Sequence, residues 1–311
     1  APLPYLDSVI FDGGGHTLRN FISNGALYTA HGASSTQLAG GLFPGSYCSA
    51  IRGLRIVDFA VSLDAASPVP VSVLLPSVGT LVGFGEHSIV SDVRVLSSGL
   101  NAGLSTSRTS YVGGVVGSVA GSLVDFVSTD STSHIFAARQ NTCSVRGGLV
   151  GAMLGPESKL SNSVNRATVH GDCTRGAGGL VGELGSGGAI VSRSLNVGNV
   201  DQGRANGAFV GTIASGGRID LEDLANTNAG IAATSLVGTV SASPPNVVLT
   251  RTMNVAVPSG SLGAVIQQLD FGAASLSGIT ATAVYYDGGP SNGALAASYT
   301  SNATVVPIAI P

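Results

Sequence analysis

The sequence predicts an all-β fold, a right-handed single-stranded parallel β-helix (solenoid) of about eight or nine coils. Three observations predict it: a glycine-rich phrase recurs along the chain, an alternating segment trails each copy, and helical periodicity is lacking. Glycine is abundant, with 45 of 311 residues. Because 44% of the residues are hydrophobic and only 10% are charged, the composition argues against a disordered chain.

The recurring phrase reads Gly-Gly-Leu-Val-Gly or a close variant. Successive copies are 27 to 39 residues apart, counted from Phe43 through the corresponding valines to Val237. The residues that define the copies are Gly41, Leu42, Leu81, Gly83, Val116, Gly117, Leu149, Gly151, Leu180, Gly182, Phe209, Gly211, Leu236 and Gly238. A unit of this size cannot bury its own apolar face, whereas stacked units can. We expect the glycines at corners that need a positive φ or a close backbone approach.

The second motif follows the first by about ten residues and alternates apolar with polar positions. It occupies residues 51–56, 90–95, 160–165, 191–196 and 249–254. Alternation rich in Val, Ile and Thr is typical of strands. Stacked at about 4.8 Å, such coils form a rod of about 40 Å with inward columns of Leu, Val and Ile. Jelly rolls, immunoglobulin sandwiches, propellers and leucine-rich repeats do not explain this period.

Three phrases together resemble the GLUG-repeat proteins. Residues 11–21 look like the usual first coil of such arrays, the Gly-Gly-Leu-Val-Gly copies like their core, and residues 279–287 like their last coil. The resemblance covers residues 8–290 or so and departs from the family at Pro44 and in the insertion between Phe59 and Gly79. It implies a β-helical domain of secreted or surface-attached proteins, including adhesins and non-catalytic parts of surface peptidases.

We therefore expect a single β-helix domain over residues 1–311. The first coil would span about residues 8–39, the repeats about 40–290, and a C-terminal extension about 291–311. No signal peptide is present, so we expect either that one has been removed or that the chain is a fragment. The longest apolar stretch, residues 65–85, contains three prolines and is not expected to insert into a membrane.

One column of charged residues follows from aligning the second motif. Asn162, Arg193, Glu222 and Arg251 would occupy it, so that Arg193, Glu222 and Arg251 alternate in sign as a cross-strand ladder. A solvated face with weak ion pairs is the plainer interpretation, and a ligand contact is the other. Asp220, Glu222 and Asp223 form the one acidic cluster. Calcium binding and paired catalytic carboxylates are its functional interpretations, and a structural role is the plainer one.

Cys143 and Cys173 precede successive copies of the glycine phrase by four and five residues. The spacing places them on adjacent coils and predicts a disulfide in an extracellular setting, with two buried thiols as the alternative. Cys48 has no partner in register, and Asn302 begins a glycosylation sequon. The histidines, none of which lies at metal-ligand spacing from another, are His16, His31, His87, His134 and His170. We expect no catalytic residue, no cofactor and no metal.

The sequence favours an extracellular or cell-surface structural or adhesive module that is not an enzyme. A carbohydrate-binding or polysaccharide-degrading β-helix is the alternative. Ice binding is a third interpretation, but the regular rows of threonine that it usually needs are lacking. The expected partners are flanking domains or other copies at the rod ends, which would give filaments, and a surface glycan or protein. The formal net charge is −3 and no basic stripe is present, which argues against nucleic acid.

Overall fold

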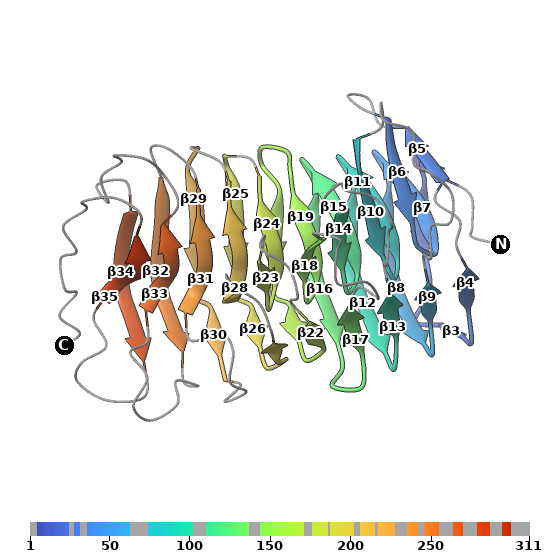
Figure 1. Cartoon of the computed structure of the whole chain (residues 1–311). Helices are drawn as coiled ribbons and strands as arrows, with labels where there is room; N and C mark the ends of the chain where they lie inside the picture. Colours follow the sequence, from blue (N-terminus) through green and yellow to red (C-terminus); the bar gives the residue numbers. More distant parts are fainter. Residues whose placement is uncertain are drawn as a thin grey trace.

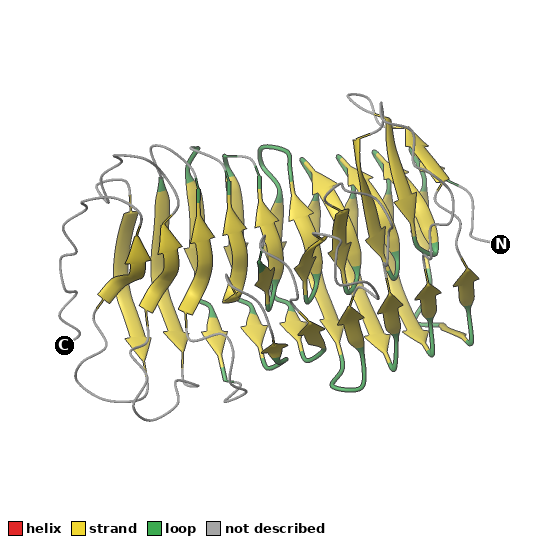
Figure 2. Cartoon of the chain, in the orientation of Figure 1, coloured by secondary structure: helices red, strands yellow, loops and turns green. Residues whose placement is uncertain are grey.

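The chain folds into stacked parallel strands, as seen in a computed structural model (Figure 1). Figure 2 shows strands and loops with no helix among the described residues. The structure describes residues 5–24, 28–31, 36–62, 74–101, 110–136, 144–170, 176–185, 187–201, 206–214, 217–227, 235–241, 246–254, 264–269, 279–286 and 294–299. This part contains no helix that is long and apolar enough to cross a membrane.

The largest sheet, sheet A, has sixteen strands in the described part of the chain. They are β1 (Leu6–Asp7), β5 (Tyr28–His31), β6 (Thr36–Gly40), β7 (Phe43–Tyr47), β10 (Leu74–Gly79), β11 (Val82–Glu86), β14 (Ser110–Gly113), β15 (Val116–Ala120), β18 (Ser144–Gly147), β19 (Val150–Met153), β23 (Ala177–Gly178), β24 (Val181–Leu184), β28 (Asn206–Ile213), β31 (Ser235–Val240), β33 (Ala264–Leu269) and β35 (Ala294–Tyr299). In most repeats two consecutive strands of sheet A flank the glycine phrase.

Among the residues that the structure describes, sheet B has thirteen strands and sheet C has six. Sheet B comprises β2 (Ile10–Asp12), β3 (Thr17–Arg19), β8 (Ala50–Val57), β12 (Ile89–Leu96), β16 (Leu123–Thr129), β20 (Lys159–Ser161), β21 (Val164–Asn165), β25 (Ala189–Ser192), β26 (Leu195–Asn196), β29 (Ile219–Glu222), β30 (Ala225–Asn226), β32 (Val247–Asn254) and β34 (Ile279–Tyr286). Sheet C comprises β4 (Ile22–Asn24), β9 (Ala60–Ser62), β13 (Gly99–Asn101), β17 (His134–Phe136), β22 (Thr168–His170) and β27 (Val200–Asp201).

As far as β27 the chain visits the sheets in the order A, B, C and then returns to A beside its previous strand, and the described strands after β27 alternate between sheets A and B. Each strand pairs with the equivalent strand of the next repeat, and these pairings are parallel. Among the described strands, only β5 and β6 pair antiparallel. In sheet A, the second apolar positions of the glycine phrase are Cα partners from repeat to repeat: Phe43, Val82, Val116, Val150, Val181, Val210 and Val237.

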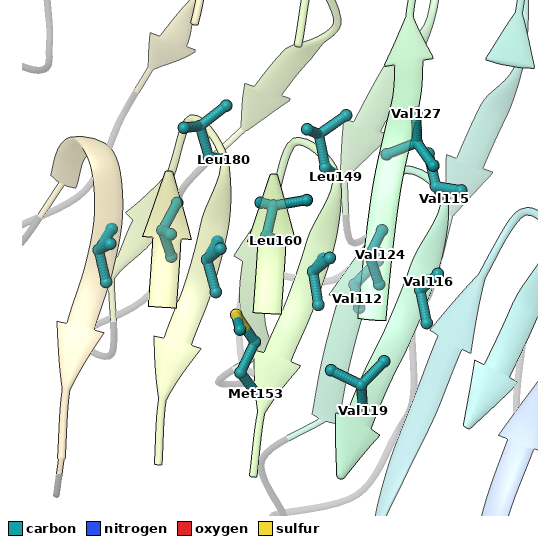
Figure 3. Packing of buried hydrophobic residues seen from close by; sticks show 14 of the residues in the cluster. Val112, Val115, Val116, Val119, Val124, Val127, Leu149, Met153, Leu160 and Leu180 are labelled. Atoms are coloured by element: carbon teal, nitrogen blue, oxygen red, sulfur yellow. The ribbon is translucent and has the colours of Figure 1, made fainter. Parts of the chain in front are cut away.

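The interior between the sheets is one continuous column of aliphatic side chains. Leu149 and Leu180 are fully buried, as are Val116 and Val150 on the same sheet. Figure 3 shows Leu149, Leu180 and the neighbouring valines directed into this shared interior. Burial of each such side chain contributes roughly 1.5–3 kcal/mol. Stacking of repeats therefore supplies the core that a single repeat lacks.

The glycine phrase marks a sharp bend between two strands of sheet A. A Cβ on Gly147 would lie 1.9 Å from the carbonyl oxygen of Val150 and 2.6 Å from the backbone nitrogen of Gly182. A Cβ on Gly151 would lie 2.3 Å from the carbonyl oxygen of Gly117. The phrase thus needs glycine for close backbone approach, because none of these glycines has a positive φ.

Buried asparagines form a ladder along the interior in the second half of the chain. Thr129 Oγ1 donates to Asn165 Oδ1 at 2.6 Å, and Asn165 Nδ2 donates to Asn196 Oδ1 at 2.9 Å. Asn196 Nδ2 in turn donates to Asn226 Oδ1 at 2.9 Å. A second bond from Asn196 Nδ2 reaches the carbonyl oxygen of Gly198 at 3.1 Å. The ladder satisfies polar groups that would otherwise be costly to bury.

Serine hydroxyls bridge the corner between sheets A and B. The backbone N–H of Ser88 donates to Ser122 Oγ at 3.0 Å, and Ser88 Oγ donates to the carbonyl oxygen of Glu86 at 3.0 Å. Val9 N–H donates in the same way to Ser49 Oγ at 3.1 Å. Each corner therefore takes a hydrogen-bond acceptor from the following repeat.

Asp130 organises the corner between sheets B and C. Its carboxylate accepts bonds from Ser97 N–H at 3.0 and 3.1 Å, from Thr132 Oγ1 at 2.7 Å and from Ser133 Oγ at 2.6 Å. Burial raises the pKa of Asp130, but the bonds from Ser133, Thr132 and Ser97 together hold it below its usual value. The ionised carboxylate is thus the form that the folded chain favours.

Replacing Asp130 with asparagine is expected to cost about 1 kcal/mol of folding free energy at pH 7, since an amide cannot accept all these bonds and solvent screens the site. A lowered folded pKa gives stability that is present above the unfolded value of about 3.9 and is lost as the pH falls through the folded value. Urea denaturation of both proteins at pH 7 and pH 2.5 measures this. A difference that persists unchanged at the lower pH would contradict the ionic origin.

Candidate functional site on the outer face of sheet B

The outer face of sheet B carries a line of residues with left-handed backbone. The line, called the corner column below, has φ between 45° and 65°. Its members are Gly53, Asp92, Phe126, Asn162, Arg193, Asp223 and Arg251. Each lies where the chain bends within sheet B, and the N–H of Arg193 donates to the carbonyl oxygen of Glu222, one residue before the next member.

The left-handed conformation suits only part of the corner column. Glycine adopts it freely, and Asp and Asn tolerate it, but for other residues it costs roughly 1–2 kcal/mol. Phe126, Arg193 and Arg251 therefore occupy a strained conformation. Phe126 also exposes 60% of its surface, so burial does not compensate for the strain. A strained, exposed aromatic residue is a candidate for contact with a ligand.

Side chains of the corner column form hydrogen bonds along the axis, with one another or with the neighbouring Asp125. Asn162 Nδ2 donates to Asp125 Oδ1 at 2.7 Å, and Arg193 Nε donates to Asn162 Oδ1 at 2.8 Å. Arg251 binds Asp223 with two bonds, Nε to Oδ1 at 2.5 Å and Nη2 to Oδ2 at 2.9 Å. The hydrogen bond from Arg251 lowers the pKa of Asp223, and the same bond raises the pKa of Arg251.

The acidic member of this ladder is Asp223 and not Glu222, which corrects the register expected from the sequence. Leu221 is the Cα partner of Val191 and of Leu249, so the corner falls two residues later, at Asp223. Glu222 instead pairs with Ser192 and Thr250 on the neighbouring strands. The ladder thus runs through Arg193, Asp223 and Arg251.

The three acidic residues at 220–223 do not converge on one point. Asp220 accepts two bonds from Arg218 Nε at 3.0 Å and lies 2.9 Å from Arg218 Nη2. Asp223 binds Arg251, as above, and Glu222 lies half-buried between them. In the described part of the chain, no group of three or more His, Cys, Asp or Glu side chains is arranged to hold a metal ion.

The repeat brings together two histidines and a carboxylate on sheet C. His134 and His170 stack with ring centroids 5.9 Å apart, and His170 Nδ1 lies 2.9 Å from Asp201 Oδ2. His170 and Asp201 are Cα partners on adjacent strands. Sequence reasoning missed this pair, although its separation of one repeat was a usable signal. His16 and His87 lie apart from it, at a turn and at the corner before sheet B.

Several predicted sites fall on parts of the chain whose structure is not described. Cys143 and Cys173, the expected disulfide pair, both lie outside the described residues, as does Asn302. Cys48 is described and is an exposed free thiol with φ of 45°. The repeat-defining leucines, valine and phenylalanine, by contrast, all lie in the main apolar core: Leu42, Leu81, Val116, Leu149, Leu180, Phe209 and Leu236.

The described architecture defines the chain as an all-β protein of stacked parallel strands, solenoid-like in its connectivity. Known proteins add nothing more specific, since no protein-family model, curated protein or solved structure matches the chain.

Proposed function

We propose that the chain is a right-handed parallel β-helix of about eight or nine coils that serves as an extracellular structural or adhesive module. The recurrent order of sheets A, B and C supports the coiled path. The right-handed sense is supported by the strong preference of connections between parallel strands in one sheet. The resemblance to GLUG-repeat proteins, which include adhesins, supports the surface location.

One observation carries the functional part of the proposal, namely the corner column. It presents one residue per repeat along sheet B, most of them exposed, and hydrogen bonds join some of these side chains between repeats. Such a line suits an extended partner, whereas a small substrate needs groups that converge from several directions. The exposed ring of Phe126 adds an apolar contact within this line.

The same module would meet its partners in two ways. A surface glycan or protein would lie along the outer face of sheet B. Flanking domains or further copies would cover the strand edges at the ends of the stack, since open edges invite pairing, and end-to-end stacking would produce a filament. A disulfide between Cys143 and Cys173 belongs to the same extracellular proposal.

A binding and cleavage screen of the purified chain tests the proposal. Neutral and acidic polysaccharides and intact cells are offered, and both retention of the chain and release of new reducing ends are measured. Retention without cleavage is expected. Release of reducing ends above the level of heat-denatured protein would establish the alternative, a polysaccharide-degrading β-helix. Electron micrographs of the same sample separate single rods from filaments.

A further inference from the structure

Arg19, Arg55 and Arg94, near the N-terminal end of sheet B, differ from other arginines of this sheet in having no acidic partner in the described structure. Arg52, Arg218 and Arg251 each bind a carboxylate within 3 Å. In contrast, no ion pair or hydrogen bond engages the side chains of Arg19, Arg55 and Arg94 within the part of the chain that the structure describes. All three are exposed. They are far apart in the sequence but lie on β3, β8 and β12, which are neighbouring strands.

The strand register brings two of these charges face to face. Arg55 and Arg94 are Cα partners on β8 and β12. Their side chains point outward because the flanking residues Leu54 and Val93 are at most 2% exposed and occupy the interior. Adjacent parallel strands are about 4.8 Å apart, so the two arginine side chains leave the sheet from neighbouring points on the same face. Arg19 lies diagonally across from Arg55, on the strand beyond it.

The fold does not neutralise this pairing. Like charges directly opposite on neighbouring strands are destabilising. The acidic residues nearest in the chain, Asp58 and Asp92, occupy corners and form no ion pair with these arginines in the described structure. Asp130, one strand away, is occupied by Ser97, Thr132 and Ser133. An external anion is therefore the natural counter-charge for the patch.

An aromatic surface lies beside the same patch. Arg94 is the Cα partner of Ser128, and Phe126 comes two residues before Ser128 on β16. Phe126 is 60% exposed and keeps a left-handed backbone that turns its side chain outward. Guanidinium groups bind carboxylates and sulfates with two parallel hydrogen bonds, and apolar faces of sugar rings stack on aromatic side chains.

We propose that Arg55, Arg94 and Phe126 form a binding site for an anionic polysaccharide. The two arginines bind its carboxylate or sulfate groups, Arg19 adds long-range attraction, and the ring of Phe126 contacts a neighbouring sugar. This inference rests on the proposed adhesive function and gives that function a ligand chemistry. Nucleic acid fits less well, because three arginines displace few counterions from a phosphate backbone.

Calorimetric titration of the full chain with polygalacturonate, dextran sulfate and uncharged dextran tests the site. We expect binding to one or both polyanions and none to dextran, and the preferred polyanion identifies carboxylate or sulfate. The double substitution Arg55→Gln and Arg94→Gln should weaken binding about tenfold or more, with loss of salt dependence. Phe126→Asn, which suits the left-handed backbone, should weaken binding without changing the salt dependence.

Arg218→Gln is the matched control, because it removes an exposed arginine directly before β29 of the same sheet, and Asp220 already neutralises that arginine. It should leave the affinity unchanged, and thermal denaturation should show that every variant is folded. Equal affinity of the double variant and the wild type would overturn the inference, as would stronger binding to single-stranded DNA than to either polysaccharide. If the wild type binds neither polyanion but is still retained on cells without cleavage, the site is disproved and the adhesive function stands.

Discussion

Replacing Gly147 with alanine is expected to lower the free energy of unfolding by about 4 kcal/mol or more, the largest effect of any single methyl group considered. The new Cβ would lie 1.9 Å from the carbonyl oxygen of Val150 and 2.6 Å from the backbone nitrogen of Gly182. Both are backbone atoms, so no side chain can rotate away. The bend itself must open, and with it the stacking of neighbouring repeats.

Gly99→Ala supplies the control. Gly99 lies in sheet C, and a Cβ there would meet nothing within 4 Å. We expect a change of less than about 1 kcal/mol, in either direction, because alanine also restricts the unfolded chain. Chemical denaturation followed by circular dichroism measures both variants. Similar midpoints for the two would mean that the close approach in the glycine phrase is not needed for folding.

Replacing Asn196 with alanine is expected to lower the free energy of unfolding by roughly 3–5 kcal/mol, the second large effect. Asn196 is 1% exposed and stands in the middle of the asparagine ladder. Its loss removes the acceptor of Asn165 Nδ2 and the donor to Asn226 Oδ1, and leaves the carbonyl oxygen of Gly198 without its bond. Several buried polar groups are then unsatisfied at once, and a cavity remains.

The neighbouring Leu195 provides the comparison, because its side chain is half-buried on the opposite face of the same strand. Leu195→Ala should cost less than half as much as Asn196→Ala, even though it removes more apolar surface. Urea denaturation curves measured under one condition give the ratio. A larger loss for Leu195→Ala would show that outer-face packing outweighs the internal amide bonds.

Periodicity in the sequence was sufficient for the parallel, all-β architecture. Each copy of the glycine phrase reports one repeat, and strand pairing joins Val116 to Val150 and Val150 to Val181, as the spacing of the copies requires. The parallel, all-β architecture could be predicted because the bend has no room for a Cβ. Only glycine fits there, so the glycine phrase recurs from repeat to repeat and marks each one in the sequence. Coil number and handedness stay proposals, since neither follows from spacing alone.

Aligning the repeats placed Asn162, Arg193 and Arg251 in one column, but the left-handed backbone of the corner column was beyond the reach of sequence patterns. The rule that side chains alternate between the inner and outer face assumes an extended backbone. A left-handed residue adds one position on the outer face, so the alternation of the residues after it is shifted by one. Phe126, Arg193 and Arg251 are not residue types that signal such a corner. The ladder was expected at Glu222 and is found at Asp223 because repeat length varies: Leu221 pairs with Val191, 30 residues before it, and with Leu249, 28 residues after it.

Contacts between side chains of different repeats were also difficult to foresee. Repeat length varies, so residues such as Arg55 and Arg94 become neighbours only once the strand register is known. The asparagine ladder did leave a trace in the sequence, because Asn165, Asn196 and Asn226 are 31 and 30 residues apart. That trace lay at the last position of the alternating motif, residues 160–165 and 191–196, away from the dominant glycine phrase.

The interior changes character where the asparagine ladder begins. Ile56 and Val95 hold this inward position in the earlier repeats, Thr129 follows them, and amides occupy it from Asn165 onward. An aliphatic column accepts any neighbour of suitable volume, while an amide column accepts only a neighbour that both donates and accepts. Gene duplications that add whole repeats should therefore be tolerated before residue 129 with few restrictions, but after it only when the inserted unit carries its own asparagine.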